Sequence, residues 1–306
     1  IAASLPDIDF VASFWLSGPD DLMAHRGFTH SFLFGLLFIL ALAFLFRHRH
    51  RIEKIPIKTW LLFMGTEIAS HLFLDVFNAY GIGWFEPFSH RRFSFNVIFV
   101  ADPFFSVWPG IAAVSLLVLN SKSNKRTKWA TWGLILCFIY LSYCVVNKMQ
   151  IDRVMRQSLE KQDLLYKRYF TTPTPFNNWL WYNVAETDSG FQIGYHSVFD
   201  SDDRISFQFF PRKDYLLDPF RNDHDLHELI RFSQGYFTAD VSEQGVVFND
   251  LRFGQMMGWQ DPGASFVFHY YLQNPNENQM VVQRGRFAHW NWKSIRAFVK
   301  RIAGKH

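Results

Sequence analysis

The first half of the chain contains four long apolar runs, at residues 29–46, 59–77, 97–119 and 129–147. A helix needs roughly 20 apolar residues, within a range of about 17–25, to cross the hydrocarbon core of a bilayer. Each run meets or nearly meets that length, so the sequence predicts a membrane α-helical bundle with four spans. The given sequence begins at Ile1 with apolar residues that are followed by Asp7 and Asp9. This start predicts one more apolar helix upstream.

Basic residues cluster in two short segments between these runs, and the clustering predicts how the bundle is oriented. Residues 47–58 follow the first run, and residues 122–128 separate the third run from the fourth. Short basic loops stay on the cytoplasmic side of a membrane, so we expect both segments there. The opposite helix ends, and everything after Asn147, are then expected outside the cytoplasm of a bacterial inner membrane. Arg91 and Arg92 lie on the outer side in this scheme and go against the rule.

The second half is mixed in composition and rich in turns. Residues 149–170 are expected to continue the last span as an amphipathic connecting helix, and residues 171–306 to form an extracytoplasmic α+β domain. Period-two alternation predicts strands at 191–195, 205–210, 246–248, 265–271 and 280–282. Helices are expected near 223–232 and 291–303. The predicted domains are therefore 1–148, 149–170 and 171–306.

Three ionisable residues follow one stripe of the second apolar run. His71 and Asp75 are four residues apart, so on a helix their side chains share a face, about 5–6 Å apart at Cβ. Glu67 lies one turn further back on the same stripe. Ionisable groups inside a span are costly and face a polar interior or a partner. The stripe predicts a metal site, with a cluster of hydrogen bonds between helices as the ordinary alternative.

Other acids and imidazoles stand at comparable helix ends, and each has an ordinary explanation when taken alone. Turns or helix caps account for single acidic residues, and two histidines five apart need not share a helix face. Taken together, they are expected on one side of the bilayer, where they would form a shared centre. The predicted metal ligands are Asp7, Asp9, His25, His30, His71, Asp75 and Asp102. Such ligands suit zinc, with manganese or iron as alternatives, and their number suggests two or more ions.

These motifs resemble the YdjM family of membrane-bound metal-dependent hydrolases. The matching phrases are Pro6-Asp7-Ile8-Asp9, His25 to Ser31, His71 with Asp75 followed by Tyr80-Gly81 and Pro87, and Asp102-Pro103. The phrase from His25 to Ser31 is the most specific of them, and together they cover a third of the chain. The family is distantly similar to zinc-dependent phospholipase C and P1-type nucleases. The resemblance therefore implies phosphoester hydrolysis, although those enzymes are soluble and use a free amino terminus as a ligand.

The first function that follows is an integral membrane hydrolase acting on a phospholipid or a lipid-linked phosphate. Metal-activated water would attack the phosphorus, and Arg26, Asp9 and Glu67 are the predicted catalytic residues. A substrate phosphate is expected to be neutralised by nearby cationic side chains, namely Arg26, Arg91, Arg92 and His90. Contact of the arginines with lipid headgroups is the alternative. The alternative is a membrane protein that binds metal without catalysis, as a sensor or structural module.

Two other classes are disfavoured. A transporter would be expected to have more spans and a pair of broken helices, which the apolar runs do not indicate. Nucleic acid is not an expected partner, because the basic loops lack interleaved aromatic residues on which bases stack. The expected partner is membrane lipid, and the oligomeric state is left open. The histidines of the second half, at His196, His224, His227 and His269, are expected to be ordinary surface or core residues.

Overall fold

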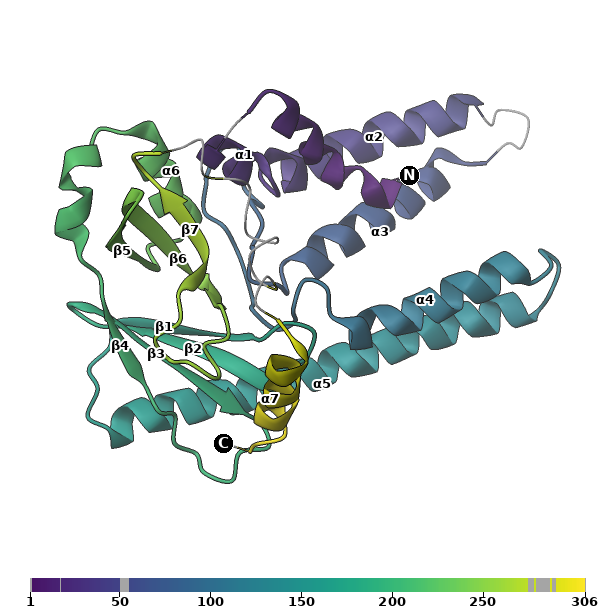
Figure 1. The fold of residues 1–306 in the computed structure, drawn as a ribbon. Helices are drawn as coiled ribbons and strands as arrows, with labels where there is room; N and C mark the ends of the chain where they lie inside the picture. The colour runs from purple at the N-terminus through teal and green to yellow at the C-terminus, as the bar shows by residue number, and fades with distance from the viewer. Residues whose placement is uncertain are drawn as a thin grey trace. The chain divides into compact units, whose positions relative to one another are not determined.

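The computed structural model describes residues 2–16, 18–49, 55–274, 278, 287 and 290–305 (Figure 1). The chain forms two compact units, each built from helices of the first half and segments of the second half. The first unit comprises Ile1–Phe95, Tyr215–Phe248 and Tyr270–Met280, and the second comprises Asn96–Asp214, Asn249–His269 and Val281–His306.

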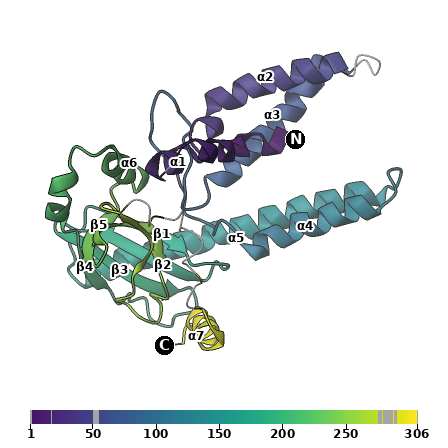
Figure 2. The same cartoon turned by 45° about the horizontal axis from the view of Figure 1, so that its top comes forward.

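The first unit begins with short helices and continues into an antiparallel pair of long ones. The short elements are the 3-10 helices η1 (Ala2–Ser4) and η2 (Pro6–Phe14), helix α1 (Gly18–Ala24) and the 3-10 turn η3 (Phe28–His30). Helices α2 (Phe32–Arg49) and α3 (Ile57–Asp75) then lie side by side (Figures 1 and 2). Gly35 permits their close approach, because a Cβ there would lie 3.3 Å from Ile68 Cγ2.

A segment from the second half of the chain supports these short helices. Helix α6 (His224–Phe232) packs against α1. His224 Nε2 lies 2.8 Å from Asp20 Oδ1, and the Tyr270 hydroxyl donates to Asp225 Oδ2 at 2.8 Å. The first unit is therefore held together by contacts between residues about 200 positions apart in the sequence.

The second unit also contains an antiparallel helix pair, α4 (Pro103–Val118) and α5 (Lys125–Lys161). A Cβ at Gly133 of α5 would lie only 2.6 Å from Ala112 Cβ, so a glycine is required where the two helices touch. Helix α5 has 37 residues. At 1.5 Å per residue it is about 56 Å long, well beyond the thickness of a hydrocarbon core. Its last turns pack Met155 and Leu159 against Ala185 of a sheet.

That sheet has four antiparallel strands in the order β1 (Arg168–Pro173), β2 (Leu180–Glu186), β3 (Gly190–Ser197) and β4 (Gln208–Pro211). After the 3-10 helix η5 (Asp214–Phe220) and α6, three more strands form a second sheet in the order β5 (Phe237–Ser242), β6 (Gly245–Gln255) and β7 (Phe266–Tyr271). Helix α7 (Trp292–Ile302) begins with an Asn291 capping box. Arg301 joins α7 to Asp200 through two nitrogens, at 2.7 and 2.8 Å.

The four predicted apolar helices are present as α2, α3, α4 and α5. Among the described residues, α2 and α5 are long and apolar enough to cross a membrane, and α4 is a shorter apolar helix of 16 residues. Two candidate spans are thus found, and the crossings by α3 and α4 stay predictions. Polar and ionisable residues such as Glu67, His71 and Asp75 lower the hydropathy of α3.

The α+β character of the second half is confirmed, with differences in detail. The predicted helices correspond to α6 and α7, and the strands predicted at 191–195, 246–248 and 265–271 to β3, β6 and β7. The strand predicted at 205–210 begins only at Gln208, and the one predicted at 280–282 lies outside the described residues. The connecting helix ends at Lys161, and Arg168–Pro173 are strand β1 instead, in keeping with the β-branched Thr171 and Thr172.

Strand β2 gave no alternating signal for a physical reason. All seven of its residues are buried, so both faces are apolar or hydrogen-bonded and the period-two pattern disappears. Strand β5 was likewise not predicted. Patterning therefore located β3, β6 and β7 and missed β2, whose residues are all buried, together with β1 and β5.

Candidate metal centre

The ionisable stripe of α3 brings two ligand atoms to the end of the helix. Asp75 is the last residue of α3, and His71 Nε2 lies 3.4 Å from Asp75 Oδ2. Glu67, a further turn back, is half-buried and has no hydrogen bond or ion pair with another described residue. The stripe thus contributes His71 and Asp75 to one point, and Glu67 is not part of that group.

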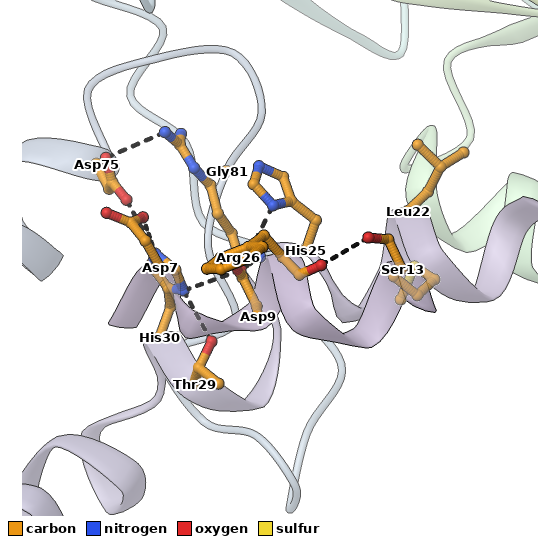
Figure 3. A network of polar contacts seen from close by, with 12 residues as sticks. Asp7, Asp9, Ser13, Leu22, His25, Arg26, Thr29, His30, Asp75 and Gly81 are labelled. Atoms are coloured by element: carbon orange, nitrogen blue, oxygen red, sulfur yellow. Dashed lines mark hydrogen bonds and ion pairs between the residues drawn. The ribbon is translucent and has the colours of Figure 1, made fainter. Parts of the chain in front are cut away.

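Two short elements add a ligand atom each to the same point. Asp7 Oδ1, from η2, lies 3.6 Å from His30 Nε2 and 3.5 Å from His71 Nε2. His30, from η3, places Nε2 3.3 Å from His71 Nε2 and 3.2 Å from Asp75 Oδ2. Figure 3 shows Asp7, His30 and Asp75 converging from separate segments of the chain. All four ligand atoms lie within 4.8 Å of one another.

These spacings fit a single divalent cation. Ligands about 2.0–2.2 Å from zinc at the corners of a tetrahedron are separated by roughly 3.3–3.5 Å. The five ligand–ligand distances given above range from 3.2 to 3.6 Å. Asp75 Oδ2 is buried and lacks a hydrogen bond among the described residues, as expected of an atom that coordinates an ion. His30 is fully buried, whereas the Asp7 side chain is 54% exposed, so water reaches the group from the Asp7 side.

Asp9 stands behind this group and orients it. Its Oδ2 accepts a hydrogen bond from the Arg26 backbone N–H at 2.6 Å and lies 3.5 Å from His30 Nδ1. A carboxylate beside one nitrogen of an imidazole fixes the tautomer that presents the other nitrogen to a metal. Thr29 Oγ1, 3.1 Å from the same Nδ1, adds to this restraint. Asp9 therefore lies beside a residue of the clustered group and outside the group itself, and its role as a ligand stays a prediction.

The protonation of the group follows from its neighbours. Burial by itself raises the pKa of Asp9, but His25 and the Arg26 N–H outweigh it, so that the pKa of Asp9 lies below its ordinary value. Burial by itself lowers the pKa of His30, but the carboxylates of Asp7 and Asp75, with Asp9 behind them, outweigh it and raise that pKa. The same negative charges that retain a proton on His30 would attract a cation to Nε2.

Arg26 connects the centre to the loop after α3. Its backbone is in the left-handed region, at φ 55°, which turns its N–H toward Asp9. The guanidinium lies 3.3 Å from Asp75 Oδ1, donates to Asn78 Oδ1 at 2.9 Å and stands over the Tyr80 ring. Arg26 therefore fixes the Asp75 carboxylate and places a permanent positive charge beside the candidate metal.

Arg92 holds the loop that carries Arg26. It is buried, and its guanidinium donates to the backbone carbonyls of Met23 at 2.8 Å and His25 at 2.7 Å, with a longer bond to Leu22. In the sequence Arg92 was an exception to the distribution of basic loops and a candidate for neutralising a substrate phosphate, whereas here its guanidinium is used by backbone carbonyls. Its burial explains the exception, because its charge is used inside the fold and does not report topology. A positively charged residue out of place in such a pattern is the signal that could have identified it.

The remaining predicted ligands lie beside this group or in the other unit. His25 is half-exposed, and its Nδ1 lies 3.5 Å from Asp9 Oδ2. Asp102 belongs to the second unit, where its carboxylate caps α4 through the N–H groups of Phe104 and Phe105 and accepts from the Tyr140 hydroxyl. Four of the seven predicted ligands are thus brought together, and two more are their neighbours.

The segment that carries Asp7 also presents large apolar side chains to the surface. Phe10 is 62% exposed, Phe14 79% and Trp15 69%, all within or directly after η2. Exposed aromatic residues of this kind are typical of a membrane–water interface. The segment that contributes Asp7 to the group thus also carries three exposed aromatic side chains of the kind found at such an interface.

Comparison with known proteins places this helical half in a family. The model of the family described as YdjM inner membrane protein matches residues 1–151. YfhP of Bacillus subtilis (strain 168) is 32% identical over 130 residues, which cover 37% of this chain and 38% of YfhP. The inner membrane protein YbcI of Escherichia coli (strain K12) is 36% identical over 95 residues, covering 30% of this chain and 53% of YbcI. The matches thus span about half, or less, of these relatives.

No solved structure matches the chain. The distant likeness to phospholipase C and P1-type nucleases accordingly stays a prediction from the sequence. All four residues of the clustered group lie within the part that the family model matches. Residues 1–151 of the chain thus match the YdjM inner membrane protein family, the family that the sequence motifs predicted.

Proposed function

We propose that this protein is an integral membrane metal-dependent hydrolase that cleaves a phosphoester at the outer membrane–water boundary. The observation that carries the proposal is the convergence of Asp7, His30, His71 and Asp75 at spacings suited to one tetrahedral cation. Two imidazoles and two carboxylates form a donor set that suits zinc, with manganese or iron as alternatives. A bound divalent cation would polarise a phosphoryl oxygen and lower the pKa of a coordinated water.

The residues around the cluster have separate roles in this proposal. Asp7 is the exposed member of the set, so substrate and water approach from its side. Arg26 supplies a fixed guanidinium that offsets the charge of a phosphoryl group and keeps Asp75 in place. Half-exposed His25, a predicted ligand whose Nδ1 lies 3.5 Å from Asp9 Oδ2, would give a proton to the leaving oxygen if it does not bind the ion. Glu67 lies one turn away from the cluster on α3, and its predicted catalytic role stays a proposal.

The number of ions is a further part of the proposal. The four clustered residues suffice for one ion. A second ion would require ligands beyond them, and Asp9 and His25 are the predicted ligands that stand next to the group. Metal analysis of the protein purified in detergent measures the stoichiometry directly. One ion per chain would mean that Asp9 supports a ligand and that His25 transfers a proton. Two ions per chain would mean that both residues are ligands.

One observation favours a second candidate, a membrane protein that binds metal without catalysis. Four protein ligands around zinc is the usual arrangement of a structural site, whereas catalytic sites keep one position for water. The exposure of Asp7 favours the catalytic reading, because a carboxylate at the surface can yield its place to water. Turnover of bis(para-nitrophenyl) phosphate by metal-loaded protein would support the hydrolase. Stoichiometric metal with no turnover of phosphomonoesters or phosphodiesters would support the second candidate.

The orientation in the membrane is also proposed. Arg47 and Arg49 end α2, and Lys125, Arg126 and Lys128 begin α5, so both helices have basic residues at the end expected in the cytoplasm. The metal centre stands at the other end of α2. A reporter that is active only in the cytoplasm should therefore give signal when it is fused after Lys54. Fused after His306 it should give none, and the reverse result would invert the proposed orientation.

A further inference from the structure

An apolar groove lies along the α2–α3 pair, in addition to the metal centre. Its volume is about 700 Å³, within the range of roughly 300–1,000 Å³ that is usual for small-molecule sites. Phe32, Leu36 and Ile39 line it from α2, Ala69 and Phe73 line it from α3, and Trp84 closes one end. The stretch from Phe32 to Ile39 covers about 11 Å of helix at 1.5 Å per residue.

The lining contains no ionisable side chain. Its polar side chains are the hydroxyls of Thr66 and Ser70 and the indole of Trp84, and the Thr66 hydroxyl already donates to the Leu62 carbonyl at 2.8 Å. A charged or strongly polar ligand would lose its hydration there without compensation. A hydrocarbon chain loses no hydrogen bonds there, and for a ligand that enters from water each buried methylene contributes about 0.8 kcal/mol.

Backbone hydrogen bonds connect the groove to the segment from Arg26 to Phe32, which contains His30. The Phe32 N–H donates to the Trp84 carbonyl at 2.9 Å, and the two rings stack at 5.4 Å. The Gly83 N–H donates to the Arg26 carbonyl at 3.0 Å. On the other helix His71 stands between Ser70 and Leu72, both of which line the groove. The groove and the metal centre therefore use different faces of the same helical turns.

We propose that this groove holds one hydrocarbon chain of a membrane lipid, with the phosphate headgroup at the Phe32–Trp84 end, beside the metal centre. The occupant is a lipid because α2 is a candidate membrane span and the family is one of inner membrane proteins. The inference rests on the proposed hydrolase and narrows its substrate to a lipid phosphoester, in which the chain in the groove keeps the ester near the cation.

Two variants separate the groove from the rest of the helix pair. Ala69→Phe adds a ring to a partly exposed wall of the groove, so it fills the groove without removing a buried side chain. Ala41→Phe is the matched control, because Ala41 is an exposed residue of α2 that does not line the groove. Each variant is purified in detergent, and its metal content is measured first to establish that the centre is intact.

The substrates form a matched pair, methyl para-nitrophenyl phosphate and hexadecyl para-nitrophenyl phosphate, which share a leaving group and differ only in the length of the alkyl chain. We expect Ala69→Phe to raise KM for the hexadecyl ester about tenfold, since displacing even two methylenes loses that much affinity. Its kcat/KM for the methyl ester should equal that of wild type, and Ala41→Phe should change neither. Equal effects of Ala69→Phe on both esters, or no effect on either, would overturn the proposal.

A second readout does not depend on turnover. Lipid retained by the purified protein is measured by mass spectrometry after extraction in the same detergent. Wild type and Ala41→Phe should retain phospholipid that Ala69→Phe loses. If wild type hydrolyses neither ester, the proposed function fails and this comparison alone decides the groove. Equal lipid content in all three proteins would then refute it.

Discussion

The helix pairs α2–α3 and α4–α5 are both apolar in sequence, but they differ in the hydrogen bonding of a carboxylate at a helix end. In α4–α5 the buried carboxylate of Asp102 is fully satisfied, by two backbone N–H groups at 2.8 and 3.0 Å and by the Tyr140 hydroxyl. In α2–α3 the buried Asp75 Oδ2 lacks a hydrogen bond and faces His30 and His71 instead.

The difference separates a structural carboxylate from one held ready for a ligand. A buried polar group that has its hydrogen bonds stabilises a helix end, as an N-cap does. A group that lacks them costs stability unless something else occupies the site. The α2–α3 pair with its preceding short helices therefore contains the group that could hold a metal ion, and the carboxylate of α4–α5 serves as a helix cap.

The largest effect is expected where an unsatisfied carboxylate is removed from the centre. Asp75→Asn keeps the shape of the side chain and removes its charge, so we expect metal affinity to fall by at least about 100-fold and hydrolysis to be lost. Metal content by mass spectrometry measures the result. Asp102→Asn is the counterpart in the other helix pair and should retain the metal. Loss of metal from Asp102→Asn would contradict the difference between the two helix pairs. It would show that Asp102 is a metal ligand, as the sequence predicts.

A smaller loss is expected when the orienting carboxylate is changed. Asp9→Asn leaves the four clustered ligands in place and weakens the restraint on His30 and on the Arg26 loop. Partners of this kind are worth about 10–100-fold in metal affinity. Competition with a chelator of known affinity gives the number. Asp202→Asn, a change to an exposed carboxylate in the second unit, serves as the matched control. Equal metal affinities in the two variants would show that Asp9 does not support the site.

Metal binding should depend on pH with a definite sign. Because the pKa of His30 is raised, the metal-free protein keeps a proton on this imidazole, and the cation must displace it. Affinity should therefore fall as pH drops through the raised pKa. In metal-free protein the protonated His30 stabilises the fold most below its unfolded pKa, about 6.5, and this contribution disappears as pH rises through the folded pKa. The rise in Tm on adding zinc should accordingly grow with pH, and a constant rise would count against His30 as a ligand.

The smallest effect is expected in the α4–α5 pair. Tyr140→Phe removes one donor from Asp102 and leaves the two backbone donors. We expect a cost of about 1 kcal/mol in unfolding free energy and no change in metal content. Chemical denaturation in detergent measures the first quantity and metal analysis the second. A loss of metal from this variant would mean that the two helix pairs are not independent in function.

The lengths of the apolar runs and the spacing of His71 and Asp75 determined much of this protein in advance. The four helices were located because apolar composition and helical period are local properties of the chain. The shared face of His71 and Asp75 follows from 3.6 residues per turn and requires no tertiary information. The clustered residues were all among the predicted ligands because imidazoles and carboxylates are visible in the sequence wherever they stand beside an apolar run.

Only the tertiary structure decided which of the seven candidates share one point. Asp7 and His30 reach α3 through short 3-10 elements whose direction no period predicts, and Asp9 differs from Asp7 only in the side of η2 that it occupies. The role of Arg92 was also invisible, because its partners are backbone carbonyls about 70 residues away. Local rules thus set which side chains are available, and long-range packing sets their distances, on which coordination chemistry depends.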